Sequence, residues 1–169
     1  MVEIFISVGS NVDAAKHIQS GVLALHRHWR ALRLSRVYES EAVGFDGDNF
    51  LNLVVAANVD ESVENVVSVL RSVEDDHRRD RGMPRFSPRT LDLDLLLYGD
   101  VVFAENGLNI PRDEITKNAF VLAPLAELAP DLVHPLVGAN YQTLWAQYDK
   151  ASQKLWPVEF EWPPEVLSH

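Results

Sequence analysis

Cysteine is absent from the 169-residue chain. This absence excludes a disulfide framework, thiolate zinc sites and cysteine nucleophiles. No apolar run reaches the roughly 18 residues that a membrane-spanning helix needs, so no membrane partner is expected. The N-terminal stretch EIFISVGSN has no basic segment ahead of an apolar one, so no secretory signal is expected either. Together these features predict a cytoplasmic protein.

Basic residues are scarce, with 15 Lys and Arg against 25 Asp and Glu and a net charge of -10. Proteins that bind nucleic acid neutralise phosphates and are more often basic, so nucleic acid is not an expected partner. The basic residues are also clustered, because six arginines lie between Arg71 and Arg89. Such a cluster in an acidic protein favours a small anionic ligand over a polymer. The sequence contains neither G-x-x-x-x-G-K-[ST] nor G-x-G-x-x-G, which excludes P-loop and Rossmann nucleotide sites.

The apolar pattern predicts one α+β domain over residues 1–169. Hydrophobic residues are 47% and charged residues 24%, which is ordinary for a globular protein. Alternating or continuous apolar runs predict strands at 2–8, 32–40, 50–59 and 90–99. Helical spacing predicts helices at 12–29, 62–77, 118–128 and 141–148. The order strand, helix, strand, strand, helix, strand is typical of a ferredoxin-like sandwich, with an antiparallel four-stranded sheet and helices on one face. The tail from Trp156 is expected to be irregular.

The stretch SPRTLDLDLLLYGD, residues 87–100, places two acids in an apolar strand. Side chains alternate across a strand, so Asp92 and Asp94 share a face, about 7 Å apart. Two ionised carboxylates at this separation need a cation between or above them, either a divalent metal or an arginine such as Arg89. By the same alternation, the side chains expected to face the helices are Leu91, Leu93, Leu95 and Leu97, and those expected beside the acids are Leu96 and Tyr98.

An oxygen-only pair suits Mg²⁺, which binds through one or two carboxylates and accepts phosphate oxygens. The clustered arginines suit the phosphates, because guanidinium groups bind phosphate oxygens in a bidentate way. Residues 78–89, RRDRGMPRFSPR, are predicted to form a loop of a length that is uncommon in compact domains and usually functional. These residues predict a metal–phosphate site and phosphoryl transfer from a nucleotide. A structural ion pair between the two acids and Arg89 or its neighbours is the alternative.

PRTLDLDLLLYGD closely resembles the signature of the 6-hydroxymethyl-7,8-dihydropterin pyrophosphokinase family. The resemblance runs over about residues 2–135 and includes VGSN, SRVYESEAVG, FLN and AFVLAPLAELAP, in that order. It implies a ferredoxin-like α+β fold. It also implies a transferase of folate biosynthesis that moves the pyrophosphoryl group of ATP to the hydroxymethyl oxygen of the dihydropterin, by attack on the β-phosphorus. The products would be the pterin diphosphate and AMP.

The resemblance further implies roles for individual residues. Two Mg²⁺ ions would be held by Asp92 and Asp94, and charge on the transferring group would be stabilised by Arg79 and Arg89. The implied ATP contacts are Arg71, Glu74, Arg81, Arg85, Arg89, Leu95, Arg112 and Asp113. The implied pterin contacts are the rings of Phe50, Phe86 and Phe120, the amide of Asn52 at the ring edge, and backbone groups around Ser40 and Val43.

The chain departs from the family pattern at three places. Ser40-Glu41 stands where a threonine–proline pair is usual, Phe86-Ser87 where tryptophan and glycine are common, and Arg112 where histidine is common. Two further hypotheses therefore stay open: a catalytically altered paralogue, including a kinase for a related heterocycle, and a non-enzymatic ferredoxin-like ligand-binding module. The six histidines show no ligand spacing and are not expected to bind zinc. The family analogy suggests a monomer.

Overall fold

Residues 1–41, 49–80 and 90–167 are described by a computed structural model, without the side chains of Arg79 and Asp80. The elements follow in the order β1 (Val2–Ser10), α1 (Ala14–Trp29), β2 (Arg33–Leu34), β3 (Val37–Ser40), β4 (Phe50–Val59), α2 (Val63–Asp80), β5 (Asp92–Tyr98), β6 (Phe103–Glu105), β7 (Leu108–Ile110), α3 (Glu114–Lys117), α4 (Ala119–Leu128), α5 (Tyr141–Gln147), β8 (Leu155–Val158) and α6 (Pro164–Leu167). The predicted order of strands and helices is confirmed from β1 to β5.

The main sheet is antiparallel, in the order β5-β1-β4-β3-β8, with β2 also paired to β4. Because β1 and β4 are adjacent at the centre and β5 pairs with β1, the ferredoxin-like class is confirmed. The predicted strand at 32–40 is divided into β2 and β3. The irregular tail was a wrong prediction, since Leu155–Val158 pairs with β3 and Pro164–Leu167 is helical. Pro157 is tolerated because β8 is an edge strand.

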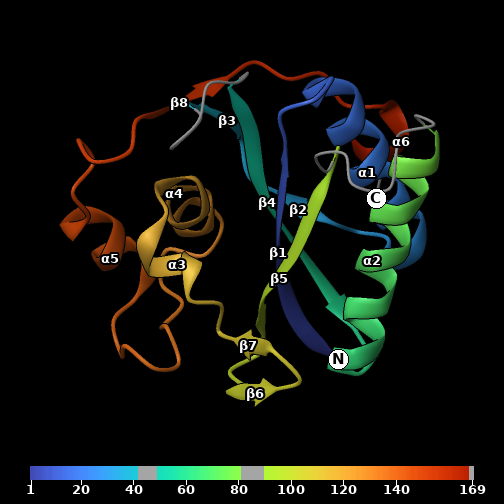
Figure 1. The fold of residues 1–169 in the computed structure, drawn as a ribbon. Helices are drawn as coiled ribbons and strands as arrows, with labels where there is room; N and C mark the ends of the chain where they lie inside the picture. The colour runs from blue at the N-terminus through green and yellow to red at the C-terminus, as the bar shows by residue number, and fades with distance from the viewer. Residues whose placement is uncertain (42–48, 81–89, 168–169) are drawn as a thin grey trace.

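Helices cover both faces of the sheet (Figure 1). The helices α1, α2 and α6 pack on one face, and α3, α4 and α5 pack on the other. The expectation of helices on one face is therefore wrong. The sequence of α4, AFVLAPLAEL, explains the second layer, because a helix that is apolar all round must be buried. No helix within the described ranges is long and apolar enough to cross a bilayer.

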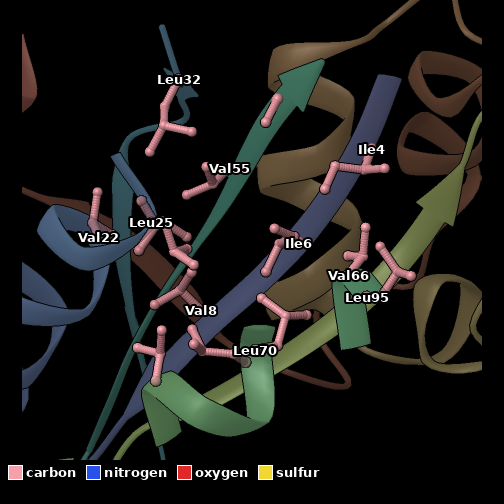
Figure 2. Close-up of a cluster of buried hydrophobic side chains, with 14 of the residues drawn as sticks. Ile4, Ile6, Val8, Val22, Leu25, Leu32, Val55, Val66, Leu70 and Leu95 are labelled. Atoms are coloured by element: carbon pink, nitrogen blue, oxygen red, sulfur yellow. The ribbon is translucent and has the colours of Figure 1, made fainter. Parts of the chain in front are cut away.

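The first core lies between the sheet and the pair α1 and α2. Figure 2 shows Ile6 and Val8 of β1, Leu25 of α1 and Leu70 of α2 directed into the same space. These side chains come from alternate positions of the strand and from one face of each helix, as the sequence periods predict. Each such buried side chain contributes roughly 1.5–3 kcal/mol relative to an exposed one. This core fixes α2 against β5.

The pairing of β5 with β1 shifts register at Leu96, which forms a β-bulge. The side chains after the bulge therefore point to the opposite face of the sheet from the one that simple alternation predicts. An extra residue reverses the alternation beyond it. Leu97 therefore packs in the second core and Tyr98 against the first, so both predictions of their facing were wrong. Asp92 and Asp94 precede the bulge and keep their common face.

Tyr141 of α5 is buried, and its hydroxyl finds no hydrogen-bond partner among the described residues. Burial raises the pKa of this phenol, which stays neutral. An unsatisfied buried hydroxyl costs about 1–3 kcal/mol. We expect Tyr141→Phe to raise the free energy of unfolding in urea by about 1 kcal/mol. The control Tyr148→Phe removes a hydroxyl that donates to the Lys117 carbonyl at 2.8 Å, and it should lower that free energy. A loss of stability in Tyr141→Phe would contradict this account.

Candidate active site

A first cavity, of about 470 Å³, opens beside α4 on the face of the sheet that α3, α4 and α5 cover. The strand residues that pack against α4 are apolar, among them Phe5 on β1 and Val54 on β4. Two positions away on each strand, on the same face, the residues are polar and line the cavity: Ser7 on β1 and Asn52 on β4. The described residues that line it are Ser7, Gly9, Ser40, Glu41, Phe50, Asn52, Asp92, Asp94, Arg112, Glu114 and Phe120.

Asn52 is buried at the floor of this first cavity, with 4% of its surface exposed. Its Nδ2 donates to Ser40 Oγ at 3.3 Å, across the pairing of β4 with β3. Gly9 is its register partner on β1. A Cβ at Gly9 would lie 2.6 Å from Asn52 Oδ1, closer than real Cβ contacts allow. Gly9 therefore leaves the room that the Asn52 amide occupies.

Asp94 has an arginine partner, with its Oδ1 3.3 Å from Nη2 of Arg112. Arg112 also lies 3.6 Å from Glu114, between its Nε and Oε1. The side chains of Asp94 and Arg112 are 32% and 30% exposed. Ion pairs this open to water are worth about 0–1 kcal/mol. A cation or a phosphate can therefore replace this contact at small cost.

A second cavity of about 240 Å³ lies along the outer edge of β5, against α2. It shares Asp94 and Arg112 with the first cavity. Glu74 of α2 accepts the Leu93 N–H at 2.9 Å and is 7% exposed. Its carboxylate thus fixes the backbone between the two aspartates. It satisfies an N–H on the outer edge of β5, where no further strand of the described sheet pairs. Among the described residues, those that line this second cavity are Val67, Leu70, Arg71, Glu74, Leu93, Asp94, Leu95, Leu108 and Arg112.

The described lining of the first cavity carries four carboxylates and one guanidinium, which are Glu41, Asp92, Asp94, Glu114 and Arg112. A polyphosphate can approach these groups only with additional cations. The donors are oxygens, and the described residues contain no cluster of three or more His, Cys, Asp or Glu that could hold a metal alone. Such a set fits a hard cation that keeps waters and takes phosphate oxygens, as Mg²⁺ does.

The structure brings together the described residues that the sequence singled out. Those in the first cavity are Ser40, Phe50, Asn52, Asp92, Asp94, Arg112 and Phe120. Those in the second cavity include Arg71, Glu74 and Leu95. Asp113 lines a pocket of about 150 Å³ beside Arg112. Outside the described residues lie Val43, Arg81, Arg85, Phe86 and Arg89, together with the side chain of Arg79.

Sequence reasoning missed four residues that line the first cavity, namely Ser7, Gly9, Glu41 and Glu114, of which Glu41 was noted only as a departure from the family pattern. Ser7 and Gly9 carried a usable signal, because they occupy alternate positions of a strand, and Ser7 precedes the VGSN motif to which Gly9 belongs. Glu114 carried none, since its place at the cavity depends on how α3 packs on the sheet.

The family model for 7,8-dihydro-6-hydroxymethylpterin-pyrophosphokinase (HPPK) matches residues 5–130. The chain belongs to this family. Two relatives are named 2-amino-4-hydroxy-6-hydroxymethyldihydropteridine pyrophosphokinase. The one from Aquifex aeolicus is 32% identical over 138 residues, covering 80% of this chain and 86% of the relative. The one from Pseudomonas aeruginosa is 35% identical over 136 residues, covering 78% and 83%.

Solved structures of the pyrophosphokinase family share the fold. The wild-type HPPK-DHPS of Plasmodium falciparum matches with a TM-score of 0.63 at 14% identity, over 88% of this chain and 44% of that one. A triple mutant of the same protein gives 0.69 at 12% identity, over 87% and 44%. The chain thus spans less than half the length of these solved structures. The likeness supports the ferredoxin-like fold of the family.

Proposed function

We propose that this chain transfers the pyrophosphoryl group of ATP to 6-hydroxymethyl-7,8-dihydropterin, giving the pterin diphosphate and AMP for folate biosynthesis. One observation carries the proposal. Asp92 and Asp94 line a cavity that also holds aromatic rings and a buried amide, and Asp94 lines in addition the second cavity along α2. Membership of the pyrophosphokinase family supports the same reaction.

The first cavity suits the pterin. Phe50 and Phe120 line it and offer apolar ring surfaces to a flat heterocycle. A pterin edge carries neighbouring C=O and N–H groups, and an amide has one acceptor and two donors to match them. One donor of Asn52 is used on Ser40, which leaves the amide a donor and an acceptor for the ring edge. We therefore assign pterin recognition to Asn52.

The second cavity suits the nucleotide, with its phosphates directed towards the shared residues. Arg112 and Asp94 belong to both linings, so the transferring group would pass at this point. Arg71 adds a cation on the α2 side. The arginines at positions 79, 81, 85 and 89 would add the phosphate contacts that the resemblance implies. Transfer in such a site depends on positioning and on compensating charge.

Asp92 and Asp94 would hold Mg²⁺, with two ions proposed. When bound, the metal neutralises the phosphate chain and orients the reacting oxygens. The chain itself supplies a strand that presents both carboxylates on one face and a buried Glu74 that holds the backbone between them. The cytoplasmic location and the monomeric state stay predictions.

The decisive experiment is an assay with ATP and the dihydropterin, with and without Mg²⁺, in which the nucleotide product is identified. AMP formed only with Mg²⁺ is the expected result. ADP as the product would show a different kinase reaction, and no turnover would favour the altered paralogue. Mg²⁺-dependent binding of a non-hydrolysable ATP analogue would argue against a plain binding module.

Gly9→Ala should weaken binding of the pterin selectively. The added Cβ would lie 2.6 Å from Asn52 Oδ1, so the amide must move. We expect the KM for the dihydropterin to rise about tenfold, equivalent to one lost hydrogen bond, with the KM for ATP unchanged. Gly138→Ala is the control, because its Cβ would meet no atom within 4 Å and its φ of 82° affects only a loop. Equal changes in both KM values would argue against this role.

A further inference from the structure

Phe120 lies in the first turn of α4, and the far end of that helix is tied firmly to the sheet. Glu127, near the C-terminus of α4, accepts Tyr38 Oη–H at 2.6 Å and the Arg36 backbone N–H at 2.9 Å. Burial, and secondarily the Glu127 carboxylate, raise the pKa of Tyr38 to about 12, so its hydroxyl keeps donating at neutral pH. The C-terminal half of α4 is therefore held on β3.

The first turn of α4 is held less firmly by its own backbone. Pro124 stands inside the helix and has no N–H. In a regular helix that N–H would bond to the carbonyl of Phe120, four residues earlier. The N-cap residue, Asn118, makes no capping side-chain hydrogen bond within the helix. The Phe120 carbonyl therefore lacks its usual donor, and the helix holds this turn through the Val121 and Leu122 N–H groups, which donate to the Asn118 carbonyl at 3.1 and 3.0 Å. The Ala119 N–H and the Asn118 side chain take their partners from outside the helix.

Gln153 supplies those contacts from the C-terminal segment. Its Oε1 accepts the N–H of Ala119, the first residue of α4, at 2.9 Å. Its Nε2 donates to Asn118 Oδ1 at 3.1 Å and lies 3.4 Å from the Lys117 carbonyl. A single side chain therefore satisfies an unpaired helix-start donor and ties the α3–α4 junction.

The segment that carries Gln153 is itself fixed against the site. Figure 1 shows the chain running from α5 past α4 to the edge strand β8. Leu155, at the start of β8, is the register partner of Ser40 on β3. Residues 151–155 also line a cavity of about 160 Å³ whose other walls include Ser40 and Phe120. The segment thus connects two residues that line the first cavity, through its pairing with Ser40 and its bond beside Phe120.

We propose that Gln153 is a positioning residue, which holds Phe120 at the spacing that a flat heterocycle requires without touching the heterocycle. The inference rests on the proposed function. It concerns a residue outside the stretch 5–130 that the family model matches. Loss of the Gln153 contacts would let the first turn of α4 move while Glu127 keeps the other end in place.

The test compares steady-state kinetics of the full chain and its variants with ATP and the dihydropterin. Gln153→Met is close in shape but removes the donor and the acceptor. We expect its KM for the dihydropterin to rise about fivefold, as for one lost hydrogen bond, while kcat and the KM for ATP change less than about twofold. Gln153→Glu should restore part of the affinity, because a carboxylate still accepts the Ala119 N–H and suits a helix N-terminus but cannot donate to Asn118 Oδ1.

Gln142→Met is the control, since Gln142 is exposed on α5 and its substitution should leave both KM values unchanged. Thermal unfolding of each variant shows whether it is folded at the assay temperature. If Gln153→Met is not folded, Gln153→Asn, one methylene shorter, provides the same readout. If the KM of Gln153→Met for the dihydropterin stayed within twofold of wild type, or if both KM values rose equally, this inference would be wrong. The proposed function would not be affected. A wild-type protein that forms no AMP would overturn the proposed function and this inference with it.

Discussion

Asp94→Asn lowers the rate of AMP formation about 10³-fold, the size of effect seen when one preorganised charge-stabilising group is removed. The amide has the shape of the carboxylate but lacks its charge, and it is a poor ligand for Mg²⁺. Asp94 lines both cavities, so its loss acts where the two substrates would meet. The rate is measured as AMP formed at saturating ATP, dihydropterin and Mg²⁺.

The fold should survive this substitution. The contact of Asp94 with Arg112 is about one-third exposed at both ends, so breaking it should change the free energy of unfolding by less than about 1 kcal/mol. Asp100→Asn, in the exposed turn after β5, is the control and should keep full activity. If Asp94→Asn kept a rate within tenfold of wild type, the pair would be a structural ion pair and the metal assignment would be wrong.

Asn52→Leu lowers kcat/KM for the dihydropterin about 100-fold while the KM for ATP stays within twofold. A site built to hydrogen-bond a polar edge loses about 1–3 kcal/mol when a buried partner is removed, because the edge is then desolvated without compensation. Leucine has the same branching and the same number of side-chain heavy atoms, so the substitution leaves no cavity and the expected loss comes from the hydrogen bonds. Initial rates at varied dihydropterin, with ATP fixed at saturation, measure it.

Asn58→Leu provides the matched control for this prediction. Asn58 lies on β4 six residues after Asn52, on the same face of the strand, but it is exposed and lines neither cavity. Its replacement should leave both KM values unchanged. Comparable losses in the two variants would show that the effect belongs to β4 as a whole and not to recognition by Asn52.

The face of the sheet on which the two acids of β5 lie could be predicted from the sequence. The face on which the last residues of β5 lie could not. Asp92 and Asp94 share a face because strand alternation is a local property that the sequence displays directly. The bulge at Leu96 depends on how β5 pairs with β1, residues far apart in the chain. Leu97 and Tyr98 were consequently assigned to the wrong faces.

Long-range contacts account for the other gaps in the prediction. The apolar sequence of α4 predicts burial but not which side of the helix meets the sheet, so Phe120 was placed near the site by family resemblance alone. Gln153 gave no signal, because it is a polar residue in a polar segment whose partners lie 34 and 35 residues earlier. Such contacts appear only when the tertiary structure is known.

The pairing of β8 with β3 protects the sheet as well as the site. Without Leu155–Val158, β3 would present the open backbone groups of Val37–Ser40 to other molecules, and such edges promote strand-to-strand association between chains. A chain shortened before Leu155 would keep both aspartates, yet it would be prone to self-association. The pairing of β8 with β3 therefore lowers the tendency of the chain to aggregate.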